Sequence, residues 1–281
     1  MLRKQIEEVY GATMNQIWGY YGWEFYGLRA CTTPQLCWCA QKYTNKVLDH
    51  VYKADISSAF PFEACKRLPT LVGSKDVFER PTPTEEFPFV FGSDGSLVFL
   101  EEDGSVIDTY DINSSPYRGN LDKIIKNQLD VAKENHYPRL PYGRPFWVKC
   151  PAGPSLAQVM EPLYQAKQAG DSVAKSIMNQ FIGYTWLRKQ PNFSHLTAVI
   201  LARCNNRIIK QAECLIDRGA IPILIATDSI AWIGKGNEIA TTDKAHKTLG
   251  AFVMEMEDGQ AIIAGPKVYQ LRAKDGHTTT T

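Results

Sequence analysis

The stretch Val51-Tyr52-Lys53-Ala54-Asp55-Ile56-Ser57-Ser58-Ala59-Phe60-Pro61 changes character in its middle. The residues up to Ala54 are typical of a strand, which we expect to end at Asp55. The small residues that follow predict a turn that exposes backbone N–H groups, and an aromatic residue then precedes a proline. A carboxylate in this position is a candidate functional group, although a single aspartate at a strand end is more often a solvated turn residue.

A second carboxylate follows another apolar strand, far along the chain. Ile221–Ile225 and Ser229–Ile233 are strand patterns, and Ala226-Thr227-Asp228 forms the turn between them. Because Asp55 and Asp228 each terminate an apolar strand, neighbouring strands would bring them together. Two adjacent carboxylates repel each other, and Mg²⁺, which prefers oxygen ligands, relieves that repulsion.

Three helices are predicted between these two sites. Residues 155–170 and a segment from Asp171 to about Arg188 form a hairpin of two helices, and Gly170-Asp171-Ser172 breaks the first and caps the second. On the second helix Lys175, Asn179 and Gly183 recur every four residues and share one face, which suits a flat anionic ligand. The third helix spans about residues 194–218 and carries an apolar stripe of Leu196, Ile200, Cys204, Ile208 and Ala212.

The remaining segments carry weaker signals. Six aromatic residues between positions 18 and 26 predict a packed corner, with base stacking as the alternative. Residues 87–111 predict a meander of three short strands with Asp-Gly turns, residues 137–154 a connector, and the last seven residues a frayed tail.

Composition bounds the class of protein. The chain has 281 residues, 44% of them hydrophobic, and a net charge of +1. This composition is not that of a disordered or a histone-like protein. It has no long apolar run and no signal-peptide pattern, so we expect a cytoplasmic protein with no membrane partner, located in the host cytoplasm if the source is viral. There are seven cysteines, and the cluster Cys31, Cys37 and Cys39 has no C-x-x-C spacing and no following histidine, which favours reduced thiols over a zinc or redox site.

Four segments resemble sequence motifs of family B DNA polymerases, in the order that this family has them. Residues 55–61 resemble motif A, D-x-x-S-L-Y-P, and residues 175–183 resemble motif B, K-x-x-x-N-S-x-Y-G. Ala226-Thr227-Asp228-Ser229 resembles motif C, D-T-D-S, and residues 267–269 resemble the K-x-Y motif of the protein-primed, phage and viral branch. The resemblance covers about residues 50–270.

The resemblance implies an α+β fold, in which a polymerase palm of antiparallel sheet backed by helices carries a short two-helix fingers hairpin. It implies that Asp55 and Asp228 are catalytic and bind two Mg²⁺ ions, for which Mn²⁺ substitutes, with the backbone of Ile56 as a further ligand. The residues implied to bind the nucleotide are Ser58, Ala59, Phe60, Lys175, Asn179 and Gly183. Those implied to contact primer or DNA are Thr227, Ser229, Lys267 and Tyr269. For Arg203 and Arg207, on the third helix, we expect either template phosphates or a solvated helix face.

The chain departs from the family patterns at several places. Ala226 replaces the first aspartate of motif C, Gln180 and Ile182 replace the serine and tyrosine of motif B, and Phe60 replaces a tyrosine but keeps the ring. The expected organisation is an N-terminal segment (1–50) without an exonuclease, a first palm segment (51–154), fingers (155–189), a second palm segment (190–270) and a tail (271–281) without a thumb. The insertion in the first palm segment resembles a region that receives a priming protein.

The expected function is template-directed addition of deoxynucleotides to a primer 3′-hydroxyl or a protein hydroxyl, without proofreading. Primer-template DNA and dNTPs are the expected partners, with a priming terminal protein and separate exonuclease, thumb or processivity subunits as further ones. Two alternatives stay open. One is a catalytically degenerate palm that serves as a DNA-binding or scaffold subunit of a replication complex, and the other is a primase-like or template-independent nucleotidyltransferase.

Overall fold

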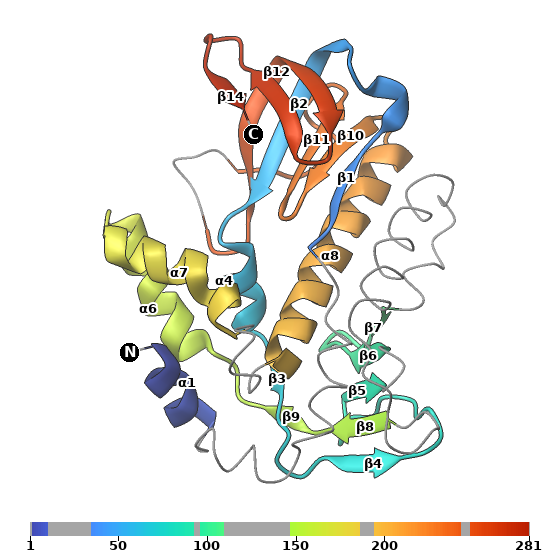
Figure 1. Cartoon of the computed structure of the whole chain (residues 1–281), viewed down its shortest axis with the longest axis vertical. Coiled ribbons are helices and arrows are strands. Elements are labelled where there is room, and N and C mark those ends of the chain that lie inside the picture. The colour runs from blue at the N-terminus through green and yellow to red at the C-terminus, as the bar shows by residue number, and fades with distance from the viewer. Residues whose placement is uncertain are drawn as a thin grey trace. The chain divides into compact units, whose positions relative to one another are not determined.

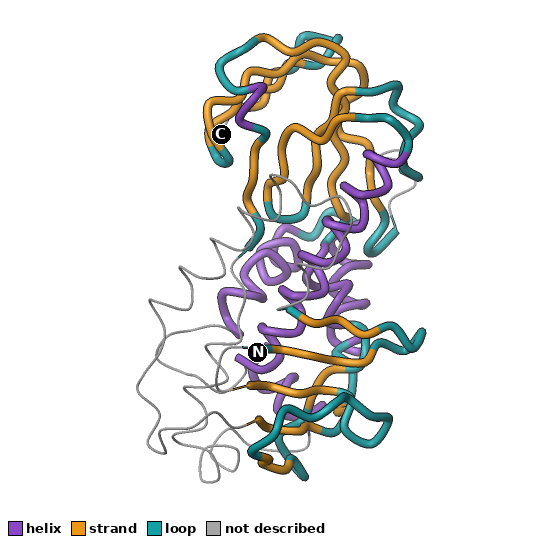
Figure 2. The backbone as a smooth tube through the Cα atoms, turned by 90° about the vertical axis from the view of Figure 1, so that its right-hand side faces the viewer, coloured by secondary structure: helices purple, strands orange, loops and turns teal. Residues whose placement is uncertain are grey.

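The computed structural model describes residues 2–10, 35–92, 96–109, 147–185, 194–242 and 248–280 (Figures 1 and 2). The chain divides into two compact units. Unit 1 comprises Met1–Pro34 and Phe60–Arg203, and unit 2 comprises Gln35–Ala59 and Cys204–Thr281. The aromatic cluster at positions 18–26 lies outside the described residues.

Unit 2 is built on a seven-stranded antiparallel sheet in the order β1-β10-β11-β2-β12-β13-β14. Its strands are β1 (Cys37–Cys39), β2 (Val47–Ile56), β10 (Ile221–Ala226), β11 (Ser229–Ile233), β12 (Phe252–Gly265), β13 (Val268–Arg272) and β14 (Thr278–Thr280). A 3₁₀ turn, Gln41–Tyr43, precedes β2. Figure 1 shows that β2, from the first part of the chain, lies between β11 and β12 from its end.

Apolar side chains on β2 and its neighbours form the core of unit 2. Val51 is fully buried and packs in one cluster with Leu48, Leu224, Ala231 and Met256. The long strand β12 changes register three times along β2, at Met254/Met256, Met256/Gly259 and Gly259/Ala261. Such irregularities bend a strand and increase its twist, which explains how a 14-residue strand follows a curled sheet.

The end of the chain is a strand rather than the frayed tail expected from its polarity. Thr278–Thr280 pairs with β13 in antiparallel register, so that Gln270 faces Thr280. Gly276, at φ +85°, turns the chain between the two strands. Threonine is β-branched and favours extended backbone, and the edge of β13 supplies the hydrogen-bonding partners. The prediction failed because an all-polar threonine run carries no alternation that marks a strand.

Unit 1 contains a five-stranded antiparallel sheet in the order β4-β8-β5-β6-β7 and a two-stranded ladder, β3-β9. The strands are β3 (Leu68–Pro69), β4 (Lys75–Val77), β5 (Phe89–Gly92), β6 (Leu97–Leu100), β7 (Val106–Asp108), β8 (Trp147–Cys150) and β9 (Ala152–Gly153). The meander β5-β6-β7 confirms the three predicted strands between residues 87 and 109, while residues 93–95 and 110–111 lie outside the described residues. The expected connector at 137–154 is wrong from Trp147 onward, because β8 pairs with both β4 and β5.

The described helices that lie wholly or mostly in unit 1 are α1 (Leu2–Tyr10), α4 (Ala59–Ala64), α6 (Ala157–Gln168) and α7 (Ser172–Thr185). As predicted, α6 and α7 form a hairpin across a short turn (Figure 1). The Asp171 carboxylate caps α7 by accepting hydrogen bonds from the backbone N–H groups of Val173 (2.8 Å) and Ala174 (3.2 Å).

Helix α8 (Ser194–Asp217) contributes residues to both units. Every member of its predicted apolar stripe is buried, from Leu196 to Ala212. Gly219, at φ +79°, ends the helix, and the N–H of Ala220 donates to the carbonyl of Leu215 (2.9 Å). This is the C-terminal glycine cap that the sequence predicts.

Two further expectations concern membranes and cysteines. In the part of the chain that the structure describes, no helix is both long and apolar enough to cross a membrane. The six cysteines within the described residues are free thiols, four of them buried. Burial raises the pKa of Cys39 and raises that of Cys65 to about 11, so both thiols stay protonated and unreactive near neutral pH.

His195 is expected to make the stability of the protein pH-dependent. Complete burial lowers the pKa of this imidazole to about 3, and its Nδ1 has no hydrogen-bond partner among the described residues. Between about pH 6.5 and pH 3 the unfolded chain binds a proton at His195 that the folded protein does not. Stability is therefore expected to fall by up to about 1.4 kcal/mol per pH unit as the pH drops through this range.

Urea unfolding between pH 7 and pH 4 tests this expectation. His195→Leu removes the titrating group, and its stability is expected to depend less steeply on pH than that of the wild type. His277→Gln, at an exposed position, is the control and keeps the wild-type slope. An unchanged slope in His195→Leu would contradict the assignment.

Candidate functional site

Asp55 lies near the end of β2, in the middle of the sheet of unit 2. It faces Ser229 on β11 and Val253 on β12. The neighbouring residues Ala54 and Ile56 are almost completely buried, whereas Asp55 is half-buried. Alternation along the strand therefore turns Ala54 and Ile56 into the core and leaves Asp55 on the other face.

Asp228 lies in the tight turn that joins β10 to β11. Ala226 and Ser229 pair across this turn, and Thr227 has φ +63°, a conformation uncommon for a β-branched residue. The N–H of Thr227 donates to the carbonyl of Leu36 (2.7 Å), and the N–H of Ile56 donates to the carbonyl of Asp228 (2.9 Å). The turn is thus held by backbone hydrogen bonds on both sides.

The structure brings Asp55 and Asp228 together, as the pattern of apolar strands predicted. Asp55 pairs with Ser229, the residue after Asp228, and the hydrogen bond from Ile56 joins the two segments directly. Carboxylates at the end of β2 and in the adjacent β10–β11 turn, together with backbone carbonyls, form a set of oxygen donors that suits Mg²⁺. The described residues contain no cluster of three or more His, Cys, Asp or Glu side chains arranged for a metal. Water and substrate oxygens would therefore complete the coordination of any ion here.

Backbone hydrogen bonds also hold the turn after Asp55. The N–H of Ser57 donates to the carbonyl of Ala251 (2.9 Å), and the N–H of Gly250 donates to the carbonyl of Ser57 (2.8 Å). Ser58 has φ +53° and is half-buried, and Ala59 is buried where α4 begins. Phe60 is half-buried and packs against the core of unit 1.

Sequence reasoning missed a charged pair beside Asp55. Lys53 forms an ion pair with Glu255 of β12, and only 12% of its side chain is exposed. Burial by itself lowers the pKa of Lys53, but the pair with Glu255 and the nearby charge of Asp55 raise it above its ordinary value overall. Lys53 is therefore a positive charge close to the carboxylates. Its position two residues before Asp55, on the same face of the strand, was the available signal.

Helix α7 presents Lys175, Asn179 and Gly183 on its exposed face, as their spacing predicts. The helix is buried in the core of unit 1 through Phe181 and Ile182. Ile182, which replaces the tyrosine of motif B, is only 5% exposed and is a core residue here.

The K-x-Y segment lies at the β12–β13 hairpin. Lys267 is exposed in the turn and Tyr269 is half-buried opposite Ile263, against the core of unit 2. Of the motif C residues expected to contact primer, Ser229 is 5% exposed and its hydroxyl donates to the carbonyl of Ala226 (3.3 Å). That hydroxyl stabilises the turn from inside, so its geometry does not fit the expected DNA contact. The Thr227 hydroxyl lies 3.9 Å from the thiol of Cys37.

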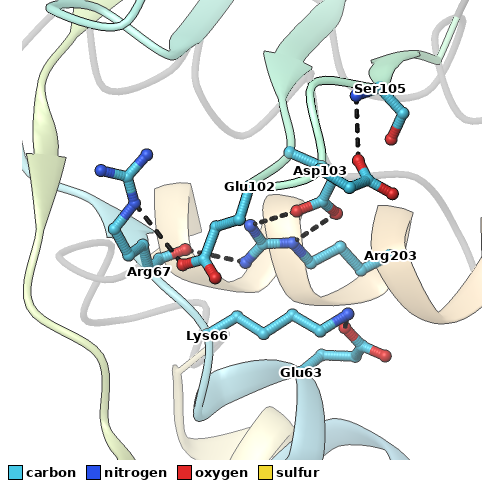
Figure 3. Close-up of polar contacts among 8 residues, drawn as sticks. Glu63, Lys66, Arg67, Glu102, Asp103, Ser105 and Arg203 are labelled. Atoms are coloured by element: carbon cyan, nitrogen blue, oxygen red, sulfur yellow. Dashed lines mark hydrogen bonds and ion pairs between the residues drawn. The ribbon is translucent and has the colours of Figure 1, made fainter.

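Arg203 does not lie on an exposed helix face, as either expectation for it requires. It is 3% exposed, and its Nε and Nη2 each donate to the carboxylate of Glu101 at 2.9 Å, while Nη1 donates to the carbonyl of Arg67 (Figure 3). Its guanidinium also stacks over the rings of Phe89 and Phe99. A template phosphate contact does not fit this position, because each guanidinium nitrogen donates a hydrogen bond inside unit 1 and the group is almost fully buried.

Arg207 is half-buried in unit 2 and is likewise turned inward. Its Nη2 donates to the carbonyl of Gly250, and its guanidinium lies over the ring of Phe252, 5.1 Å from the centroid. These contacts also do not match the expected phosphate contact or a solvated helix face. They place Arg207 behind the turn that follows Asp55.

No protein-family model and no curated protein matches the chain, but solved structures match its fold. Phi29 DNA polymerase complexed with primer-template DNA, in the post-translocation binary complex, matches with a TM-score of 0.61 at 15% identity, over 99% of this chain and 56% of that one. The ternary complex of the same polymerase, with primer-template DNA and incoming nucleotide substrates, matches with a TM-score of 0.60 at 14% identity, over 92% and 54%. The complex with single-stranded DNA gives 0.58 at 14% identity, over 92% and 52%.

These matches define the class of fold. The chain is a mixed helix-and-sheet protein with a curled antiparallel sheet, similar in fold to the palm of phi29 polymerase. The α+β palm expected from the sequence is confirmed. The chain spans a little over half the length of the polymerases it matches.

Proposed function

We propose that the chain is a template-directed DNA polymerase, which adds deoxynucleotides to a primer hydroxyl. The observation that carries this proposal is the pairing of Asp55 with the Asp228 turn on adjacent strands of a palm-like sheet. The DNA and nucleotides bound to the phi29 polymerase structures support primer-template DNA and dNTPs as partners.

The reaction joins the primer hydroxyl oxygen to the α-phosphorus of a dNTP. The bond from that phosphorus to the β-phosphate oxygen breaks, pyrophosphate leaves, and the hydroxyl proton passes to water. Asp55 and Asp228, with the carbonyl of Ile56, would hold two Mg²⁺ ions, or Mn²⁺ as a substitute. When bound, such ions stabilise the charge on the attacking and leaving oxygens. The hydroxyl belongs to a DNA 3′ end or, in a protein-primed reaction, to a protein side chain.

The other proposed roles follow from where the residues lie. Lys175 is an exposed cation suited to triphosphate, and Asn179 and Gly183 share its face of α7. The pinned turn at Ser58 and Ala59 offers backbone to the triphosphate, and Lys267 and Tyr269 would hold the primer end. A priming protein and separate exonuclease, thumb or processivity subunits are further proposed partners.

A primer-extension assay tests the proposal. The protein is incubated with a 5′-labelled primer on a longer template, Mg²⁺ and the four dNTPs, and template-dependent lengthening of the primer is expected. Extension without a template, or from ribonucleotides alone, would instead favour a template-independent or primase-like transferase.

One observation favours a second candidate. Ala226 occupies the position of the first aspartate of motif C, and it pairs with both Cys37 and Ser229 without offering a carboxylate. A degenerate palm that serves as a DNA-binding or scaffold subunit would bind primer-template tightly and incorporate nothing with either Mg²⁺ or Mn²⁺.

The sugar selectivity of the proposed polymerase is expected to depend on Phe60. The ring follows directly after the turn at Ser58 and Ala59, and a ring under the sugar excludes a 2′-hydroxyl by steric contact. Phe60→Ala is expected to lower the ratio of kcat/KM for dNTP over rNTP by about tenfold or more, equivalent to about 1.4 kcal/mol of discrimination.

Single-nucleotide incorporation with dNTP and rNTP measures this ratio. Phe62→Ala, a half-buried ring on the same helix, is the matched control and keeps the wild-type ratio. A folded Phe60→Ala protein with unchanged selectivity would refute the role.

A further inference from the structure

Helix α8 reaches the turns that carry both candidate catalytic aspartates. Asn205 and Arg207 lie on either side of Cys204 and Ile208, two members of its buried stripe, because each residue advances about 100° around a helix. Asn205 reaches the segment before β1, and Arg207 reaches the segment before β12.

Asn205 acts on the Asp228 turn through Leu36. The side chain of Asn205 is 8% exposed, and its Oδ1 accepts a hydrogen bond from the N–H of Leu36 (3.3 Å). The carbonyl of Leu36 in turn accepts the N–H of Thr227 (2.7 Å). Thr227 is the β-branched residue at φ +63° that directly precedes Asp228. A strained conformation of this kind persists only where its surroundings hold it.

Arg207 acts on the Asp55 turn through Gly250. Its guanidinium donates to the carbonyl of Gly250, whose N–H donates to the carbonyl of Ser57 (2.8 Å). The same guanidinium stacks on Phe252, which faces Ile56 across the ladder. This turn also contains a residue in the left-handed region, Ser58 at φ +53°.

We propose that Asn205 and Arg207 are positioning residues, which hold the Asp228 and Asp55 turns in a common geometry and so set the affinity of the aspartate pair for divalent metal. The expected effect on catalysis rests on the proposed function, whereas the hydrogen bonds from Asn205 and Arg207 to the two turns do not depend on it. Residues that orient metal ligands from behind change metal affinity or activity by about 10–100-fold when they are replaced.

The experiment measures Mn²⁺ binding to the purified full chain by electron paramagnetic resonance, with Mn²⁺ alone. Asn205→Leu removes the acceptor and Arg207→Met removes the donor, and each is expected to raise the Mn²⁺ dissociation constant about tenfold or more. Asn205→Asp keeps an acceptor oxygen toward Leu36 and is expected to stay close to the wild-type value. Asn206→Ala and Lys210→Ala, next to these positions on the same helix, are the matched controls.

Amide hydrogen exchange of the peptides that contain Thr227 and Ser57 is the second measurement. Faster exchange is expected in the Thr227 peptide for Asn205→Leu and in the Ser57 peptide for Arg207→Met, each at its own turn. In primer extension kcat is expected to fall about tenfold or more, with little change in the KM for dNTP.

These measurements separate the two proposals. If the wild type incorporates no nucleotide but the variants bind Mn²⁺ more weakly than it does, the positioning role is supported and the polymerase function is overturned. Unchanged Mn²⁺ affinity and unchanged exchange in folded Asn205→Leu and Arg207→Met would overturn the positioning role. If the wild type binds no Mn²⁺, or if one variant fails to fold, amide hydrogen exchange in the folded variant that remains tests the proposal. Exchange at the wild-type rate in the turn that this substitution should loosen would then overturn the proposal.

Discussion

Asp228→Asn is expected to lower the rate of nucleotide incorporation by about a thousandfold or more, while the protein stays folded. A metal-bound carboxylate contributes several kcal/mol of charge stabilisation to the transition state, and about 4 kcal/mol corresponds to three orders of magnitude in rate. The amide has the size of the carboxylate but no charge. The backbone hydrogen bonds that hold the turn, from Thr227 to Leu36 and from Ile56 to Asp228, do not involve the side chain.

Single-turnover primer extension at saturating dNTP measures this loss. Asp217→Asn removes the same charge from an exposed position at the end of α8 and is the matched control, with activity near that of the wild type. Thermal unfolding of both variants shows whether the fold is retained. Primer extension by Asp228→Asn at close to the wild-type rate would show that Asp228 is not part of the catalytic site.

Arg203→Met is expected to lower the free energy of unfolding by about 3–5 kcal/mol, the usual cost of removing one partner from a buried ion pair. Only 2% of the Arg203 side chain and 15% of Glu101 are exposed, and two hydrogen bonds join them. Removing the guanidinium leaves the Glu101 carboxylate without its bidentate partner and the carbonyl of Arg67 without the donor Nη1. Urea unfolding measures the difference.

Figure 3 contains the matched control for this prediction. Arg67 and Glu102 form a second pair of the same chemistry at 3.6 Å, with side chains 49% and 63% exposed. Solvent screens such a pair, so Arg67→Met is expected to cost about 0–1 kcal/mol. In the double variant Arg203→Met/Glu101→Gln the loss is expected to be smaller than the sum of the single losses, because no unpaired charge is left.

The salt dependence of DNA binding tests the same assignment independently. Each phosphate contact of a cation adds about 0.7–0.9 to the slope of log affinity against log salt. Folded Arg203→Met is expected to keep the wild-type slope, since its guanidinium is occupied inside unit 1. If Arg203→Met instead reduces the slope of log affinity against log salt by about one, with little loss of stability, Arg203 contacts template phosphate as the sequence led us to expect.

Much of the fold was predictable because local signals agreed. Helices α6, α7 and α8 and the hairpin β10–β11 lie close to their predicted bounds, since apolar periodicity, the Asp171 cap and Gly219 all mark them. Strands β8 and β14 were missed, because a proline-rich flank masks the first and the threonine run of the second has no apolar alternation. Their pairing depends on strands far away in the sequence.

The candidate site, like the fold, was predictable from the sequence only in part. The exposed face of Lys175, Asn179 and Gly183 follows from helical spacing alone. The burial of Ile182 does not, because it comes seven residues after Lys175 and so lies close to it around the helix. The arginines of α8 were misassigned, because a charged residue beside a buried stripe is solvated by default. The partners that bury them, Glu101 and Gly250, lie far along the chain.

The sequence by itself determined helices α6, α7 and α8, the meander β5–β7, the hairpin β10–β11 and the two candidate aspartates, since strand ends, turns and helix faces depend on neighbours within a few residues. Only the tertiary structure decided the register that sets Asp55 opposite Ser229, the burial of Arg203 and the hydrogen bonds from Asn205 and Arg207 to the two turns. The reason is physical: strand pairing and the desolvation of a charge depend on groups that the chain brings together only on folding, and no local pattern encodes them.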